Sequence, residues 1–297
     1  MNRQNTTENT VTGKSSVAIV GAGRLATFLA LALHKAGFRV TEIIARDSPR
    51  SRRRARALAA KVGACSSTAD SAILDATWLW FCVPDREIRQ AAFLLAKHIH
   101  RKKNKVRVAF HSSGALLSGE LDPLRKAGVA VASVHPLMTF VAGAHPSLTG
   151  VPFALEGDAA ATRLARQIVH ALGADSFSLP GQRKAAYHAW ATFTSPLLLA
   201  FLVTLEETAV GAGIRPRDAR RKSLPIIMQT LANYARFGPA HSFSGPLIRG
   251  DLGTVAKHLA VLKKHPGARE VYVALARVAL RGLPVKNRSG LRRLLAG

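Results

Sequence analysis

Short apolar runs alternate with longer amphipathic stretches over the first half of the chain. The runs that have the length of a strand lie at residues 17–20, 39–45, 78–83, 106–110, 129–134, 151–155 and 176–179. Most of them are followed by a segment in which apolar residues recur with helical spacing. Strands and helices that alternate in this way are typical of a mostly parallel sheet covered by helices. The pattern therefore predicts an α/β domain over residues 15–180.

The pattern changes after Pro180-Gly181, where strand-like runs end and helical spacing continues alone. A long helix is predicted from Arg183 to about Val210, with a kink at Pro196 because proline lacks the amide hydrogen that a helix needs. Further helices are expected at 217–237, 251–264 and 268–281. Residues 181–297 are therefore interpreted as an all-helical second domain, and the polar residues 1–14 as a disordered tail.

The first strand leads into Gly21-Ala22-Gly23-Arg24-Leu25-Ala26, a sequence that predicts a dinucleotide-binding turn. Gly21 permits the sharp turn, Gly23 lets the backbone approach a pyrophosphate, and Ala26 keeps the helix close to the sheet. The amide groups at the start of that helix would face the phosphates. The motif indicates a Rossmann-type sheet domain, although a glycine-rich turn without a ligand could share it. The turn residues assigned to the cofactor are Gly21, Ala22, Gly23, Arg24 and Leu25.

The end of the second strand favours NADP over NAD. Arg46 follows Ala45, and Ser48 comes shortly after, where an NAD-binding domain would carry a carboxylate for the ribose 2′-hydroxyl. A guanidinium and a hydroxyl suit a phosphate instead, whereas Asp47 argues in the opposite direction. We therefore predict NADP(H) as the cofactor, bound by Arg46 and Ser48. The ends of later strands add Val83, Pro84 and Ser112 to the predicted cofactor site.

The formal charge of +26 is the unusual feature of the composition. Basic residues form one block at 50–56 and another at 97–107. Such charge attracts nucleic acid without specificity, but no helix-turn-helix, zinc finger or aromatic RNA-binding signature accompanies it. We interpret it as the surface of an enzyme whose small-molecule substrate is anionic, with nucleic-acid binding as a remote alternative.

The cysteines indicate a reducing compartment. The chain has two, Cys65 and Cys82, and Cys82 falls within an apparent buried strand, so a disulfide framework is not expected. No uninterrupted apolar run reaches the ~18 residues that cross a bilayer. A cytoplasmic protein without a membrane anchor is predicted.

Polar residues cluster where the later strands end, at the edge where open α/β sheets bind ligands. His111, Ser112 and Ser113 follow one strand, and His135 follows another. We assign His111 to catalysis and expect the others to contact the substrate or the nicotinamide ribose. A turn satisfied by its own hydroxyls, or a buried structural histidine, would give the same pattern. The predicted substrate-binding residues of this edge are Ser113, Gly114 and His135.

Several segments resemble bacterial Rossmann-like proteins whose helical second domain is a domain of unknown function of the DUF2520 type. The matching segments are GAGRLA at 21–26, HSSG at 111–114, SVHPLMTF at 133–140, KAAYHAWATFTSP at 184–196 and SGPLIRGD at 244–251. The wider superfamily includes pyrroline-carboxylate reductases, ketopantoate reductases and β-hydroxyacid dehydrogenases. The resemblance implies a nicotinamide-dependent oxidoreductase, usually dimeric. The family usually carries Ser-Asn where this chain has Ser195-Pro196, so one polar amide of the expected substrate site is missing.

Lys184 and His188 are one helical turn apart and share a face of the predicted helix. The corresponding helix of β-hydroxyacid dehydrogenases carries a lysine and, four residues later, an asparagine. Hydride transfer to a carbonyl or imine needs a proton donor, and a desolvated ammonium can supply the proton. Lys184 is thus expected to be the donor, with His188 orienting it. A surface lysine and a helix-packing histidine are the alternative.

Two further residues complete the predicted substrate site. Ser195 lies in the family segment, and Arg249 lies between glycines in an otherwise apolar loop, where it could clamp a substrate carboxylate. A surface arginine is the alternative for Arg249. The eleven histidines form no HxxxH or HExxH arrangement, so no metal is predicted.

The predicted protein is an NADP-dependent oxidoreductase that transfers a hydride between NADPH and a small keto acid or imine. It is expected to be a homodimer, because the helix around 197–203 is too apolar to face water. A non-catalytic NADP(H)-binding regulator is the main alternative, and the missing asparagine at Pro196 would suit it.

Overall fold

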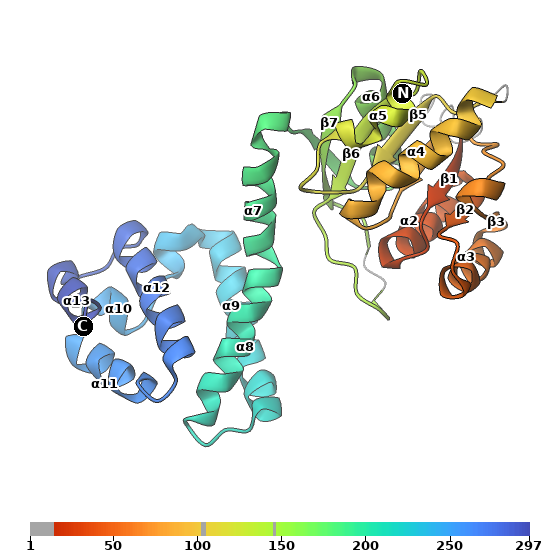
Figure 1. The fold of residues 1–297 in the computed structure, drawn as a ribbon. Coiled ribbons are helices and arrows are strands. Elements are labelled where there is room, and N and C mark those ends of the chain that lie inside the picture. Colours follow the sequence, from red (N-terminus) through yellow and green to blue (C-terminus); the bar gives the residue numbers. More distant parts are fainter. Residues whose placement is uncertain (1–14, 102–104, 145–146) are drawn as a thin grey trace, which may run out of the picture. The chain divides into compact units, whose positions relative to one another are not determined.

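The computed structural model describes residues 15–101, 105–144 and 147–297. The predicted tail, residues 1–14, lies outside the described residues. Within the described chain, a sheet of eight strands has the order β3-β2-β1-β4-β5-β6-β7-β8 (Figure 1). The first six strands are parallel to one another and follow the order of a Rossmann fold. The strands are β1 (Ser16–Val20), β2 (Arg39–Ala45), β3 (Cys65–Thr68), β4 (Trp78–Phe81), β5 (Val108–His111), β6 (Ala130–Pro136), β7 (Pro152–Gly157) and β8 (Asp175–Ser178).

The two faces of the sheet are covered by different helices. Alternate residues of a strand point to opposite faces, so Val17 and Ile19 of β1 pack in one apolar core and Ala18 and Val20 in another. The first core contains residues of α2 (Arg24–Lys35), α3 (Pro49–Val62) and α6 (Ala159–Ala171). The second contains residues of α4 (Asp85–Arg101) and α5 (Asp122–Arg125). A sheet with helices on both faces confirms the predicted α/β architecture.

Strand β7 departs from the parallel pattern because it runs antiparallel to β6. Its register places Glu156 opposite Ser133 and Ala154 opposite His135. Strand β8 then pairs with β7 in parallel. This pairing brings an acidic residue of β7 beside the polar end of β6. The short, partly exposed strand β3 was not predicted, because Cys65–Thr68 carries no apolar run.

The chain divides into two compact units, residues 1–191 and 192–297. The division falls within α7 (Lys184–Thr194), whereas the sequence predicts a boundary at residue 180. The opening turns of α7 belong to the first unit because Lys184 and Tyr187 are buried there against the sheet.

The second unit is helical, as predicted. Its helices after α7 are α8 (Pro196–Val210), α9 (Pro216–Ser242), α10 (Pro246–Arg249), α11 (Leu252–Leu262), α12 (Pro266–Gly282) and α13 (Arg288–Leu294). An apolar core formed by α11, α12 and α13 includes Val255, Val273 and Leu291. The short helices α10 and α13 were not predicted from the apolar spacing.

The predicted long helix from Arg183 to Val210 is interrupted rather than kinked. Ser195 has non-helical dihedrals (φ −134°, ψ −71°), and Pro196 begins a new helix. Pro196 fits there because the first residue of a helix needs no amide donor. By length and composition alone, the stretch Gly181–Val210 is apolar enough to cross a membrane, although it contains no uninterrupted apolar run of that length.

Candidate cofactor and substrate site

The glycine-rich turn leaves no room for a side chain at its first glycine. Gly21 adopts φ +119°, and a Cβ atom there would lie 2.5 Å from the carbonyl oxygen of Cys82. A Cβ on Gly23 would meet no atom within 4 Å, so the space beside it is open. No side chain of the described residues caps the amino end of α2, which starts at Arg24. The amide groups of this helix start are therefore available to an anion.

Two cavities flank this turn. One has a volume of about 430 Å³ and a largely apolar lining that includes Val20, Ile44 and Val83. The other has a volume of about 610 Å³ and is lined by Gly23, by one arginine of α2 and two of α3, and by two phenylalanines. An apolar cavity suits a flat ring, and a basic cavity suits phosphates. The close approach at Gly21 and the two cavities together fit a dinucleotide.

Arg46 and Ser48 are at the end of β2, as predicted, but both already have partners within the chain. Arg46 forms an exposed ion pair with Glu87 at 2.9 Å. The Ser48 hydroxyl accepts a hydrogen bond from the Ser51 amide and so caps α3. Asp47 pairs with Arg52. An exposed ion pair is weak, so Arg46 can exchange Glu87 for a phosphate.

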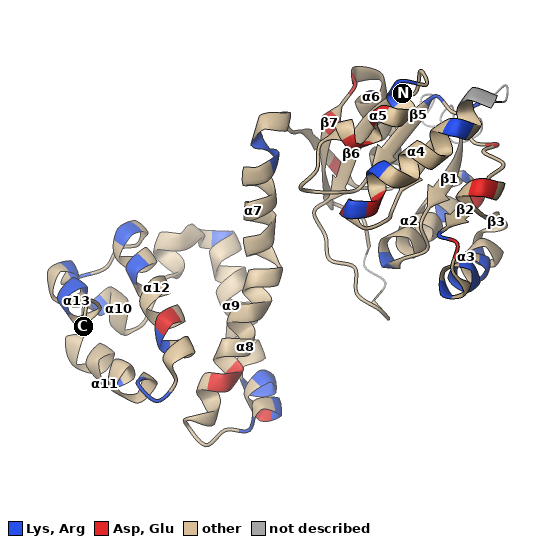
Figure 2. Cartoon of the chain, in the orientation of Figure 1, with Lys and Arg blue, Asp and Glu red and all other residues tan. Residues whose placement is uncertain are grey.

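The basic block that follows β2 forms α3 (Figure 2). The arginines of this helix are exposed. Arg50 and Arg54 of this helix line the basic cavity together with Arg24. Residues 102–104 of the second predicted block lie outside the described residues.

Ser112, Ser113 and Gly114 have structural partners at the end of β5. Ser112 accepts a hydrogen bond from the Trp80 indole at 2.8 Å. Ser113 donates to Asp85 at 2.8 Å and accepts from the amides of residues 115 and 116. A Cβ on Gly114 would lie 2.8 Å from Nε2 of His135. These three residues fix the turn and leave little room beside His135. Val83 lines the apolar cavity, and Pro84 is exposed next to it.

His111 is completely buried, and both of its ring nitrogens are hydrogen-bonded to the backbone. Nδ1 accepts from the Ser113 amide at 3.1 Å, so Nε2 carries the hydrogen that is donated to the Leu117 carbonyl at 3.0 Å. Burial lowers the pKa of His111 to about 4. A neutral imidazole whose two nitrogens are both engaged by the backbone is a poor proton donor at neutral pH. The geometry therefore favours a structural role for His111 over the predicted catalytic one.

Lys184 is buried, with 3% of its side chain exposed. Its Nζ donates a hydrogen bond to Ser133 Oγ, which in turn donates to the Ser113 carbonyl at 3.0 Å. Glu156 Oε2 lies 3.8 Å from Nζ. Burial lowers the pKa of Lys184 to about 8, and the charges of Glu156 and Asp85 limit that fall. Lys184 is thus a desolvated amine whose proton is labile near neutral pH.

Tyr187, which sequence reasoning missed, accompanies Lys184 on the buried side of α7. Its hydroxyl lies 2.7 Å from Nδ1 of His135. Burial lowers the pKa of His135 to about 4 and raises that of Tyr187 to about 12, so a neutral imidazole and a neutral phenol share this hydrogen bond. His188, one helical turn after Lys184, is exposed. Residues three and four positions after Lys184 both lie on its side of the helix. The sequence spacing therefore allowed Tyr187, as well as His188, as the partner of Lys184.

Asp85, Ser133 and Glu156 were also not predicted as site residues. A signal existed for Glu156, because it is the charged residue of the otherwise apolar strand Pro152–Gly157. Ser133 and Asp85 carry no such signal, since a serine in a strand and an acid at a helix start are common.

Ser195 and Arg249 belong to the second unit. Ser195 precedes α8 and is exposed, and Arg249 ends α10 and is also exposed. Gly250 after it adopts φ +69°, and a Cβ there would lie 2.7 Å from the Lys286 carbonyl oxygen. This close approach fixes the turn that carries Arg249. Their assignment to substrate binding stays a prediction.

Neither described cysteine is in a disulfide. In the part of the chain that the structure describes, no group of three or more His, Cys, Asp or Glu residues is arranged to hold a metal ion.

Two family models match the chain. A Rossmann-like domain matches residues 1–136, and the domain of unknown function DUF2520 matches residues 151–279. The chain therefore contains a Rossmann-like domain followed by a DUF2520 domain. The resemblance inferred from the sequence motifs is thereby confirmed. No curated protein gives a match to the sequence.

Solved structures share this two-domain fold over most of their length. A candidate NADP oxidoreductase from Bacteroides fragilis is 22% identical, with a TM-score of 0.71 over 89% of this chain and 97% of that protein. A protein from Thermotoga maritima is 24% identical, with a TM-score of 0.68 over 88% and 96%. An imine reductase from Myxococcus stipitatus in complex with NADP+ is 15% identical, with a TM-score of 0.62 over 94% and 99%. At these identities the likeness establishes the fold of the Rossmann-like and DUF2520 domains.

Proposed function

We propose that this DUF2520 protein is an NADPH-dependent reductase of a small anionic carbonyl or imine compound. The observation that carries the proposal is Lys184, a desolvated amine with a pKa near 8 at the ligand-binding edge of a Rossmann-type sheet. The glycine turn and the basic cavity beside it support the dinucleotide part of the proposal. The imine reductase with NADP+ and the two pyrroline-carboxylate reductases among the structures of similar fold support reduction of a C=N bond.

Each group of the site has a definite task in this proposal. Gly21, Gly23 and Arg24 bind the pyrophosphate, and Arg46 binds the 2′-phosphate. NADPH, when bound, supplies the hydride. Lys184 gives a proton to the oxygen or nitrogen atom of the substrate that gains electron density, and its ammonium charge stabilises that atom beforehand. Protonation by a general acid near its pKa is efficient at neutral pH, so a pKa of about 8 suits the task.

The proposal is tested with purified full-length protein, NADPH and a panel of cyclic imines and 2-keto acids. We expect substrate-dependent loss of NADPH absorbance with at least one member that carries a carboxylate. The same panel with NADH measures cofactor preference. Tight NADPH binding without turnover of any imine or keto acid would favour the alternative, a non-catalytic NADP(H)-binding regulator. Salt-sensitive binding of nucleic acid without NADPH binding would favour the remote alternative.

An exposed apolar face on α8 and α9 supports a homodimer. Large apolar side chains on these two helices are exposed in the single chain. They include Leu199, Val203, Ile226, Met228 and Tyr234. Large apolar side chains exposed on two helices that pack on each other mark a contact site with another macromolecule or a membrane. We propose that a second copy of the chain covers this surface, and not a membrane. Glu206 of α8 and Arg220 of α9 form an ion pair there, and α7, which precedes α8, begins buried against the sheet.

We expect the protein to sediment as a dimer at micromolar concentration. Replacing Leu199 and Val203, which are one turn apart on α8, together by glutamate should produce monomers, because like charges would be buried in the apolar interface. The matched control replaces Leu275 and Val278 together by glutamate, which places the same two charges on exposed apolar positions of α12. A native protein that is monomeric in sedimentation and whose stability is independent of dilution contradicts the dimer.

A further inference from the structure

The ammonium of Lys184 is held between two neighbouring strands. Ser133 on β6 accepts its hydrogen bond, and Glu156 on β7 lies 3.8 Å away. The antiparallel register sets Ser133 directly opposite Glu156, so both groups reach Nζ from the sheet. The Glu156 side chain is only 15% exposed. Water therefore screens the attraction between the two charges weakly.

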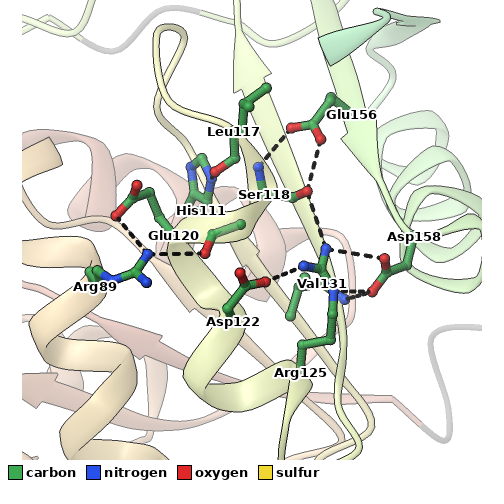
Figure 3. A network of polar contacts seen from close by, with 11 residues as sticks. Arg89, His111, Leu117, Ser118, Glu120, Asp122, Arg125, Val131, Glu156 and Asp158 are labelled. Atoms are coloured by element: carbon green, nitrogen blue, oxygen red, sulfur yellow. Dashed lines mark hydrogen bonds and ion pairs between the residues drawn. The ribbon is translucent and has the colours of Figure 1, made fainter.

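The Glu156 carboxylate is itself fixed by Ser118 (Figure 3). The Ser118 amide donates to Oε2 at 2.7 Å, and the Ser118 hydroxyl donates to Oε1 at 2.8 Å. Arg125 donates to the same hydroxyl at 3.4 Å and pairs with Asp158 at 3.1 Å. Both oxygens of Glu156 are thus directed by a continuous polar network. The carboxylate cannot rotate away from Lys184 without breaking one of these bonds.

Few charged groups besides Glu156 influence the pKa of Lys184. The titratable groups that act on this cluster are Asp85 of α4, His111 of β5, His135 of β6, Glu156 of β7 and the exposed His188 of α7 itself. The two strand histidines are neutral at pH 7, because burial lowers the pKa of each to about 4. Two charges raise the pKa of Lys184, and the effect of Glu156 is larger than that of Asp85.

From this geometry we infer that Glu156 is a positioning residue, which holds the Lys184 ammonium in place and keeps it protonated near neutral pH. The inference rests on the proposed function, since it concerns the proton donor of the proposed reductase. Burial by itself drives Lys184 toward the neutral amine. A neutral amine has no proton to give to the substrate. Glu156 opposes burial, so the donor remains charged until the pH approaches 8.

The experiment measures the titration of Lys184 directly in the full-length protein. With ¹³C-labelled lysine, the Cε resonance that disappears in Lys184→Met is assigned to Lys184 and followed as a function of pH. In the native protein we expect a midpoint near 8. In Glu156→Gln the midpoint should fall by about one pH unit, because an opposite charge within ~4–6 Å favours the charged form. Glutamine keeps the shape of the side chain and an oxygen for the Ser118 amide.

The matched control is Glu120→Gln. Glu120 lies in the same segment as Ser118 and pairs with Arg89 at 3.9 Å, so its replacement removes one negative charge without touching the Lys184 network. The midpoint in this variant should stay at the native value. If Glu156→Gln does not fold, Glu156→Asp serves instead. The aspartate withdraws the charge by one methylene, and its midpoint should lie below the native one.

A native midpoint in a folded Glu156→Gln or Glu156→Asp protein would overturn the inference. That result, together with NADPH-dependent turnover that Lys184→Met abolishes, would leave the proposed reductase intact. A lowered midpoint combined with full turnover by Lys184→Met would support the effect of Glu156 on Lys184. The same result would exclude Lys184 as the proton donor of the proposed reductase. With an active substrate, the alkaline limb of kcat in Glu156→Gln should shift with the midpoint, and KM should remain near its native value.

Discussion

Lys184→Met should lower kcat by about 10²- to 10⁴-fold, the usual loss when a general acid is removed. Methionine has a similar length and no proton to donate, so the fold can keep the volume of the side chain. Affinity for NADPH should change little, because the glycine turn and the arginines that we assign to the phosphates lie elsewhere on the sheet. The measurement is steady-state kinetics with the best substrate of the panel, and fluorescence titration with NADPH.

The pH dependence of the native enzyme gives an independent view of the same group. The protonated form of Lys184 is the active one, so kcat should be constant below pH 7 and fall as the pH rises through about 8. The control variant is Lys126→Met, which removes an exposed lysine of the same unit. It should match the native enzyme in rate and pH profile. Normal turnover by a folded Lys184→Met protein would exclude Lys184 as the donor.

Arg46→Ala should remove most of the preference for NADPH over NADH. A charge-assisted hydrogen bond with the 2′-phosphate is worth roughly 1.5–3 kcal/mol, which corresponds to about ten- to a hundredfold in affinity. The Arg46–Glu87 pair is exposed at the arginine, so its loss should barely change the free energy of unfolding. The measurement is the ratio of the dissociation constants for NADPH and NADH, in the native protein and the variant.

Arg53→Ala is the matched control for the cofactor experiment. It removes the same charge from the neighbouring helix α3, at an exposed position outside both cavities of the glycine turn. The control should keep the native preference for NADPH. If the loss of any positive charge were enough, the preference would fall equally in Arg46→Ala and Arg53→Ala. Equal affinity of the native protein for NADPH and NADH would contradict the assignment of Arg46 to the 2′-phosphate.

Local sequence patterns were sufficient for the sheet domain and for the cofactor turn. The apolar runs of β1, β2, β4, β5 and β6 are buried strands because their side chains leave water on both faces of a parallel sheet. The turn at Gly21 follows from a positive φ and the close approach of Cys82, and both require glycine at that position. These features depend on neighbouring residues, so a sequence can reveal them.

The Lys184 cluster required the tertiary structure. A lysine on an amphipathic helix can face water or the sheet, and only packing against β6 and β7 buries Lys184 and lowers its pKa. The same packing selects Tyr187 over His188 and leaves His111 without a titratable role near neutral pH.

By itself the sequence determined the Rossmann-type order of strands and helices, the dinucleotide turn and the helical character of the second unit. The tertiary structure decided the antiparallel register of β7, which brings Glu156 opposite Ser133 from a separate part of the chain. It also decided that the helix predicted over 183–210 breaks at Ser195. The physical reason is that strand pairing and burial depend on residues distant in sequence, whereas turns and helical periodicity depend on residues a few positions apart.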